Sequence, residues 1–197
     1  MTDDSDPSGS EPATQPGFDP AAYDAVIYDL DGTLVRLSVD WGAVADDVLD
    51  AYASQGIVPP TDDLWSLFAI AADYGLAETV EATIASHERA GAEASTRLPL
   101  AGILTTDGAQ RTAVCSLNCE EACRIALGTH DLSDGVSAVV GRDTVEGHKP
   151  DPGPLLSAVD ALGVDPEHAL FVGDSERDAV TARRAGVPFR YVSDVLE

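Results

Sequence analysis

The chain has 197 residues, 44% of them hydrophobic, which suits one domain with a buried core, or one domain with a modest insertion. Its 35 acidic residues outnumber 11 basic ones, and the formal net charge of −24 argues against nucleic acid or anionic membranes as partners. The sequence shows no apolar run of the ~18 residues that a membrane span needs and no secretory signal, so we expect a cytoplasmic protein.

The choice of charged residues is also informative. Lys149 is the only lysine, all other basic residues are arginine, and aspartate predominates among the acids. An acidic, lysine-poor surface is an expected adaptation to high salt, where counterions screen self-repulsion. The composition therefore predicts a halophilic source, such as a halophilic archaeon, with an acidic protein of an ordinary cytoplasm as the alternative.

The first predicted strand follows an acidic segment. Residues 1–22 are rich in Ser, Pro and Gly and contain no basic residue, which predicts a disordered tail. Residues 25–28 carry β-branched and aromatic residues and are too few for a helix, so they predict a buried parallel strand. Asp29 and Asp31 come directly after it, and alternate residues of an extended chain point the same way. Two carboxylates so close together need a cation or a shared proton.

Residues 36–97 have helical spacing and no strand-like run. Amphipathic segments are expected around residues 44–52, 64–71 and 80–91. This stretch carries 11 acidic and 3 basic residues, so its outer faces should be solvated. The pattern predicts a helical insertion between the first and second core strands.

Strands and helices alternate after residue 98. Strands are expected at 112–116, 136–140, 169–172 and 189–192, and helices at 152–162 and 176–185. A further helix is expected between Asn118, as its N-terminal cap, and Gly128. The alternation predicts an α/β fold in which helices cover both faces of a parallel sheet.

Polar residues follow several of these strands, and the carboxyl ends of parallel strands converge on one edge. They are Asp29, Asp31, Ser116, Lys149, Asp174 and Asp178. Taken singly, Ser116 could be a capping residue and Asp178 a solvated carboxylate. Lys149 is harder to explain in this way, because the chain has no other lysine. A flexible ammonium is suited to holding a phosphate oxygen and a carboxylate together.

Over nearly all of residues 24–193 the sequence resembles the haloacid dehalogenase superfamily. The four matching motifs are Asp29-Leu30-Asp31-Gly32-Thr33-Leu34, Ser116 after an apolar strand, Lys149 before Pro150, and Gly173-Asp174-Ser175-Glu176-Arg177-Asp178. The resemblance implies a Rossmann-like core, residues 23–35 and 98–197, with a small all-helical cap, residues 36–97. Leu117 and Arg36 depart from patterns that are frequent in the family and in its phosphoglycolate phosphatase-like members, which leaves the substrate open.

The resemblance also implies a phosphatase for a small phosphorylated metabolite. Asp29 would attack phosphorus and form an aspartyl-phosphate. Asp31 would protonate the leaving oxygen and then deprotonate the water that hydrolyses the intermediate. Mg²⁺ would lie between the Asp29 side chain, the Asp31 backbone carbonyl and Asp174, a set of oxygen ligands that suits this ion.

Three further roles follow from the same resemblance. Ser116 and Lys149 would hold the transferring phosphoryl group, and Asp178 would orient Lys149 or a metal-bound water. A cap closes poorly over a macromolecule, so we expect a small substrate. Arg36, Arg89 and Arg97 are the only cations of residues 36–97 and are candidates for a substrate carboxylate, with pairing to cap acids as the alternative.

Other functions fit the residues less well. A dehalogenase does not use the acid at Asp31, and a phosphonatase needs a cap lysine that residues 36–97 lack. A receiver domain places its lysine last, whereas here Asp174 and Asp178 follow Lys149. A phosphosugar mutase, which shares all four motifs, stays as an alternative, as does a catalytically silent phosphate-binding protein.

Overall fold

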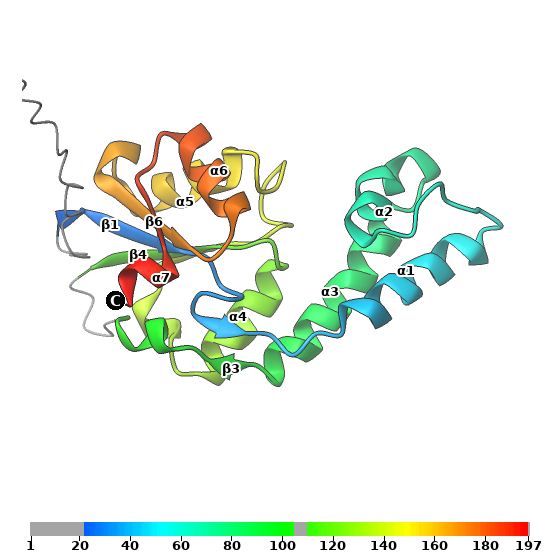
Figure 1. Ribbon diagram of the computed structural model, residues 1–197, viewed down its shortest axis with the longest axis horizontal. Helices are drawn as coiled ribbons and strands as arrows, with labels where there is room; N and C mark the ends of the chain where they lie inside the picture. The colour runs from blue at the N-terminus through cyan, green and yellow to red at the C-terminus, as the bar shows by residue number, and fades with distance from the viewer. Residues whose placement is uncertain (1–21, 105–109, 197) are drawn as a thin grey trace, which may run out of the picture.

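The computed structural model describes residues 22–104 and 110–196, so nearly all of the expected tail at 1–22 lies outside the described residues. Five parallel strands form the central sheet in the order β5-β4-β1-β6-β7 (Figure 1). They are β1 (Ala25–Tyr28), β4 (Arg111–Cys115), β5 (Ala138–Val140), β6 (Ala169–Gly173) and β7 (Phe189–Tyr191). The predicted α/β fold class is confirmed.

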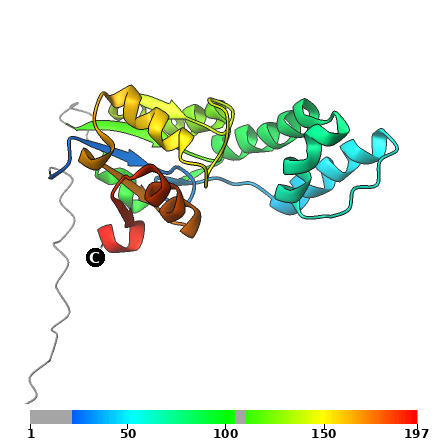
Figure 2. The same cartoon turned by 90° about the horizontal axis from the view of Figure 1, so that it is seen from above.

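Helices cover both faces of this sheet, above and below it in Figure 1, and Figure 2 shows the upper face. The covering helices are α4 (Glu120–Thr129), α5 (Gly153–Leu162) and α6 (Glu176–Ala185). Alternate residues of β1 enter different cores: Val26 and Tyr28 pack in the cluster that includes α4, and Ala25 and Ile27 in the one that includes α5 and α6. A strand buried on both faces explains why residues 25–28 are uniformly apolar.

The segment between β1 and β4 forms a separate helical unit. It contains α1 (Trp41–Ser54), α2 (Leu64–Ile70), the 3₁₀ turn η2 (Ala71–Tyr74) and α3 (Ala77–Glu93). The unit has its own apolar core, which includes Val48, Leu67 and Ile84. In Figure 1 it stands apart from the sheet, and α3 runs from α4 towards α2. We propose that this unit is the cap, with the expected limits 36–97.

The structure corrects several details of the sequence-based prediction. The helical unit begins and ends in an antiparallel ribbon, β2 (Val35–Arg36) with β3 (Thr96–Arg97), whose two-residue strands are too short to leave a sequence pattern. The last strand stops at Tyr191, and a short helix, α7 (Val192–Val195), begins where a strand residue was expected.

The predicted capping of α4 is wrong at both ends. Its N-cap residue is Cys119 rather than Asn118, and the helix continues through Gly128 to Thr129. The backbone N–H groups of Cys119 and Glu120 donate instead to carboxylates distant in sequence, Glu88 and Asp143. Long-range carboxylates therefore accept from the N–H groups of the N-cap residue and of the first helical residue.

The remaining short elements are 3₁₀ turns in the connections. They are η3 (Pro99–Gly102), η4 (Ser133–Gly135) and η5 (Pro166–His168). Within residues 22–104 and 110–196, no helix combines the length and apolar character required to span a bilayer.

Candidate active site

The first motif lies at the carboxyl end of the central strand. The Asp29 N–H still bonds to the Val172 carbonyl of β6 at 2.9 Å, which fixes the backbone that carries its carboxylate. The carboxylate is 6% exposed at the floor of a cavity of about 270 Å³, which Asp31 also lines. Gly32 follows with φ +86°, and a Cβ there would overlap the Asp174 carboxylate. Glycine therefore allows the β1 loop to approach the β6 loop closely.

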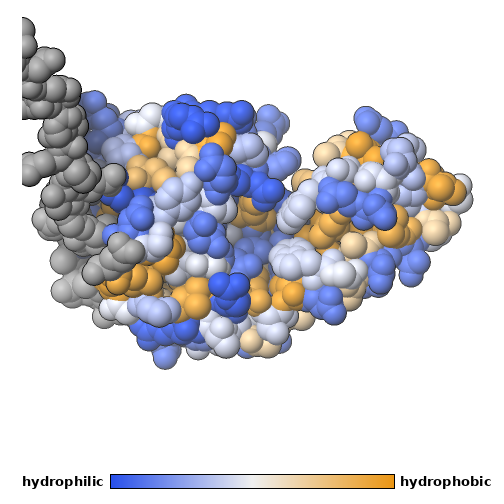
Figure 3. Space-filling view, in the orientation of Figure 1, coloured by the Kyte–Doolittle hydropathy of each residue, from blue (hydrophilic) through white to orange (hydrophobic). Residues whose placement is uncertain are grey.

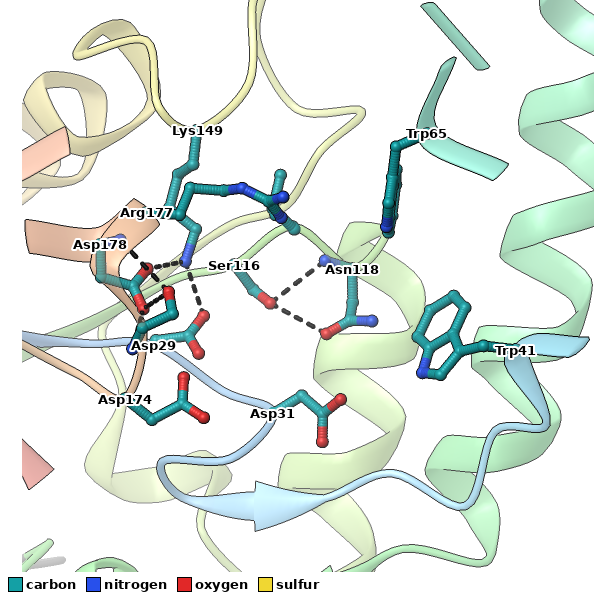
Figure 4. Close-up of a pocket in the computed structure, with 12 residues that line it drawn as sticks. Asp29, Asp31, Trp41, Trp65, Ser116, Asn118, Lys149, Asp174, Arg177 and Asp178 are labelled. Atoms are coloured by element: carbon teal, nitrogen blue, oxygen red, sulfur yellow. Dashed lines mark hydrogen bonds and ion pairs between the residues drawn. The ribbon is translucent and has the colours of Figure 1, made fainter. Parts of the chain in front are cut away.

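The single lysine is buried at the centre of the site. Lys149 Nζ donates to Asp29 Oδ1 at 2.7 Å, to Asp178 Oδ1 at 2.5 Å and to the Cys115 carbonyl at 3.2 Å. These contacts use all three of its donors, and the residue is only 3% exposed. In Figure 4 the ammonium lies between Asp29 and Asp178. The lysine thus joins the end of β1, the last residue of β4 and the first turn of α6.

This cluster has an excess of negative charge. Burial raises the pKa of Asp29 to about 7, although the Lys149 ammonium lowers it. Burial would lower the pKa of Lys149, but the Asp29 and Asp178 carboxylates outweigh that effect and raise it. Burial also raises the pKa of Asp31 and of Asp174. A second cation at this position would relieve the repulsion among these carboxylates.

Three carboxylates are placed to share such a cation. Oxygens of Asp29, Asp174 and Asp178 lie within 4.8 Å of one another. An all-oxygen donor set without His or Cys fits Mg²⁺. The Asp31 side chain takes no part in this group, since its Oδ1 accepts a bond from the Leu37 N–H at 2.9 Å.

Asp178 is held from both sides. Its Oδ1 accepts from Lys149, and its Oδ2 accepts from the Ser175 hydroxyl at 2.6 Å and the Ser175 N–H at 3.2 Å. The Ser175 hydroxyl also accepts from the Asp178 N–H, completing a capping box at the start of α6. The helix terminus therefore fixes the carboxylate that orients the lysine.

Ser116 lies on the opposite side of Asp29 from Asp174, as Figure 4 shows. It is 3% exposed and follows β4, whose ladder continues through the Ser116 N–H to the Val140 carbonyl at 2.9 Å. Its hydroxyl donates to Asn118 Oδ1 at 3.1 Å and accepts from the Asn118 N–H at 3.2 Å. All six residues expected at the site, Asp29, Asp31, Ser116, Lys149, Asp174 and Asp178, line the one cavity.

Six further residues line the cavity and were not predicted from the sequence as site residues. They are Trp41, Trp65, Leu117, Asn118, Ser175 and Arg177. Trp41 and Trp65 come from the helical unit, with ring centroids 5.9 Å apart, and the Arg177 guanidinium lies 6.0 Å from the Trp65 ring. Figure 3 shows the hollow between the two parts of the molecule. The available sequence signals were that Leu117 and Asn118 directly follow Ser116 and that Ser175 and Arg177 belong to the fourth motif, whereas nothing near the two tryptophans pointed to the cavity.

The arginines of the insertion do not reach the cavity. Arg89 pairs with Glu121 on α4 at 3.5 Å, and Arg97 donates to the Ala101 carbonyl at 3.0 Å. Arg36 is exposed on the β2–β3 ribbon and, like the other two, is absent from the described lining of the cavity. Besides Lys149, Arg177 is therefore the cation among the described lining residues.

Comparison with known proteins gives consistent matches. Residues 105–192 match the haloacid dehalogenase-like hydrolase family. The chain is 36% identical over 186 residues to the phosphoglycolate phosphatase of Rhodospirillum rubrum, covering 83% of this chain and 77% of that protein. It is 43% identical over 58 residues to the phosphoglycolate phosphatase of Escherichia coli K12, covering 29% of this chain and 23% of that protein.

Solved structures agree on the fold. A superfamily hydrolase, subfamily IA, from Geobacter sulfurreducens is 27% identical with a TM-score of 0.59, covering 85% of this chain and 88% of that one. A family hydrolase from Deinococcus radiodurans, solved with bound phosphate and sodium, is 20% identical with a TM-score of 0.56, covering 87% of this chain and 81% of that one. The second likeness concerns the fold alone.

Proposed function

This chain belongs to the haloacid dehalogenase-like hydrolases and is a phosphatase, and we propose that it hydrolyses small phosphate monoesters through a phosphorylated Asp29. The observation that carries the proposal is the buried Asp29 carboxylate, which Lys149 holds through Oδ1 at 2.7 Å at the floor of the cavity. Lys149 is the side chain that donates to this carboxylate among the described residues, and it does so at Oδ1, so Oδ2 is the oxygen proposed to attack phosphorus.

Asp31 is the proposed general acid and base. It lines the same cavity, and its Oδ1 is held by the Leu37 N–H at 2.9 Å, so the carboxyl group has a fixed position. It would protonate the departing alkoxide as Asp29 forms its bond to phosphorus. In the second step it would take a proton from the water that attacks the phosphorylated Asp29.

Lys149 and Ser116 are proposed to hold the transferring phosphoryl group from two sides. Both side chains are buried and both line the cavity beside Asp29. Fixed donors of this kind favour the negative charge of the transition state, because they need no reorganisation during the reaction.

Asp29 and Asp174, with the Asp31 backbone carbonyl, would hold Mg²⁺. The oxygens of Asp29 and Asp174 belong to the carboxylate group described above, and Asp178 would fix Lys149 beside it. A bound Mg²⁺ would neutralise charge on the phosphoryl oxygens.

The residues at the mouth of the cavity, Trp41, Trp65 and Arg177, favour a small substrate that carries a second anionic group. In the described part of the chain no carboxylate lies within ion-pair distance of Arg177, although 35 residues of the protein are acidic. A guanidinium stacked 6.0 Å from Trp65 is suited to a carboxylate or a second phosphate at this mouth. Relatives named phosphoglycolate phosphatase are consistent with such a substrate.

A metabolite panel tests this function. The full chain, purified with Mg²⁺, should release inorganic phosphate from an aryl phosphate and faster from a phosphorylated acid such as phosphoglycolate. Transfer of phosphate between hydroxyls of one sugar would favour the mutase instead. Absence of both reactions, with the protein folded, would favour a phosphate-binding protein.

A further inference from the structure

One carboxylate of the helical unit is completely buried outside the catalytic cluster. Glu88 on α3 is 0% exposed. Arg142, in the loop after β5, pairs with it at two points: Nη1 donates to Oε1 at 2.6 Å and Nη2 to Oε2 at 3.0 Å. Charged side chains are almost never fully buried unless they are paired. This pair joins the helical unit to the sheet domain, which is the five-stranded sheet with α4, α5 and α6.

Every N–H donor of the Arg142 guanidinium has an acceptor in this position. Nε and Nη2 donate to Glu81 at 3.0 and 2.7 Å, and Nη1 also donates to the Leu117 carbonyl at 2.8 Å. These bonds use all five of its N–H donors. Its guanidinium carbon lies 5.5 Å from the Phe68 ring centroid on α2, and its backbone N–H donates to the Asn118 carbonyl at 2.9 Å.

The preceding residue shows how closely these loops pack. A Cβ at Gly141 would overlap the backbone N–H of Glu120. The loop after β5 therefore lies directly against the start of α4, and Arg142 extends from this contact to α3. One guanidinium thus fixes the spacing between α3 and the loop after β4.

Glu88 also contacts the lining of the cavity, through Asn118. Its Oε1 accepts from Asn118 Nδ2 at 3.2 Å, and its Oε2 accepts from the Cys119 N–H at 3.0 Å. With its amide nitrogen held in this way, Asn118 turns Oδ1 towards the Ser116 hydroxyl, 3.1 Å away (Figure 4). The connected chain of contacts is Arg142, Glu88, Asn118 and Ser116.

We infer that Glu88 and Arg142 are positioning residues that set Ser116 for the phosphoryl group. The inference rests on the proposed function, in which Ser116 binds that group. Without the Glu88 carboxylate, the Asn118 amide and the Cys119 N–H lose their acceptor, and residues 116–119 lose the contact that fixes their conformation. The position of α3 and the conformation of Ser116 in the cavity are therefore coupled.

Inorganic phosphate is the probe for this coupling, as a competitive inhibitor of aryl phosphate hydrolysis by the full chain. Ser116→Ala should weaken inhibition about tenfold, and Glu88→Gln about three- to tenfold. In the Ser116→Ala background, Glu88→Gln should weaken phosphate inhibition hardly any further, because both substitutions act on the contact between Ser116 and phosphate. Glu81→Gln is the matched control: Glu81 pairs with the same arginine from the same helix, and among the described residues it has no hydrogen bond to Asn118 or Cys119. It should change phosphate inhibition less than about twofold.

The possible outcomes distinguish the proposed role of Ser116 in phosphate binding from the positioning role of Glu88. If Ser116→Ala leaves inhibition unchanged, the proposed role of Ser116 is wrong. If Ser116→Ala weakens inhibition and Glu88→Gln does not, or the two effects multiply, the positioning inference is overturned. If Glu88→Gln fails to fold, Asn118→Ala breaks the same link and leaves the Arg142 pair intact. Asn118→Ala must then weaken phosphate inhibition by itself and add nothing in the Ser116→Ala background. If phosphate inhibits Asn118→Ala as strongly as it inhibits the wild-type protein, the inference is overturned.

Discussion

The sheet domain and the helical unit use charge in opposite ways. The sheet domain buries Asp29, Lys149 and Asp178 side by side at the ends of its strands. Residues 36–97 carry 11 acidic and 3 basic residues, and Glu88 is the only one of these that is buried. Because burying charge is costly, the residues that bear it mark the places where function or attachment requires it.

The helical unit contributes shape instead. It brings Trp41 and Trp65 to the mouth of the cavity, while the groups proposed for the chemistry all follow strands of the sheet. The sheet domain and the helical unit should therefore respond differently to substitution. Changes at the strand ends should abolish the reaction, and changes at the mouth should alter which substrate is bound.

Removal of a metal ligand should have the largest effect. Asp174→Ala removes one of three neighbouring carboxylates, and we expect Mg²⁺ affinity, measured by calorimetry, to fall by about 100-fold or more. EDTA should abolish wild-type activity, and added Mg²⁺ should restore it. Asp160→Ala on α5, an exposed aspartate of the same domain, is the control. Undiminished Mg²⁺ binding by Asp174→Ala would contradict the proposed site.

Substitution at the mouth should have a smaller and selective effect. Arg177→Met should raise KM about tenfold for a phosphorylated acid, because an ionic hydrogen bond is lost, and leave KM for a neutral aryl phosphate nearly unchanged. Arg183→Met, exposed on the same helix, should alter neither value. Equal losses on both substrates would remove Arg177 from substrate selection.

The smallest expected effect is the dependence of the unfolding midpoints on salt concentration. Self-repulsion extends over a Debye length of ~10 Å at 0.1 M salt and ~3 Å at 1 M, so the acidic helical unit should loosen first as salt falls. Both tryptophans of the chain lie in that unit, so their fluorescence reports its unfolding and its separation from Arg177 on α6. At about 0.1 M KCl the fluorescence midpoint should fall below the far-UV dichroism midpoint, and at about 3 M the two should coincide.

A control at one charge pair sharpens the salt prediction. Asp46 and Asp50 are exposed one turn apart on α1 and repel each other. Changing both to Asn should raise the low-salt fluorescence midpoint and leave the high-salt midpoint unchanged. Midpoints that are flat or fall with added salt would contradict the prediction of a halophilic protein.

The sheet domain was predictable because its signals are local. Residues 25–28 form a strand buried on both faces, and residues 176–185 form the helix at the expected limits. The site residues were found because each follows a strand, and Lys149 because it is the only lysine. Such features depend on neighbours in the chain and on one rule of parallel sheets.

The missed features depend on distant pairs. Arg142 and Glu88 are 54 residues apart in sequence, and nothing near either one indicates its partner. Glu88 also explains the error at Asn118: this side chain was expected to cap α4, but it donates to Glu88, which also accepts from the N–H of the N-cap residue Cys119. Trp65 and Arg177 likewise meet only through the fold.

The account depends most on covalent chemistry at Asp29, and trapping of the phosphorylated enzyme tests it directly. Asp31→Asn should still accept a phosphoryl group from an aryl phosphate and should lose it slowly, because the base that activates water is absent. After an acid quench and digestion, mass spectrometry should find one phosphoryl group on the peptide that contains Asp29, and none when Asp29→Asn is also present. An unmodified Asp29 in a variant that keeps normal turnover, or a phosphoryl group on another residue, would contradict the account.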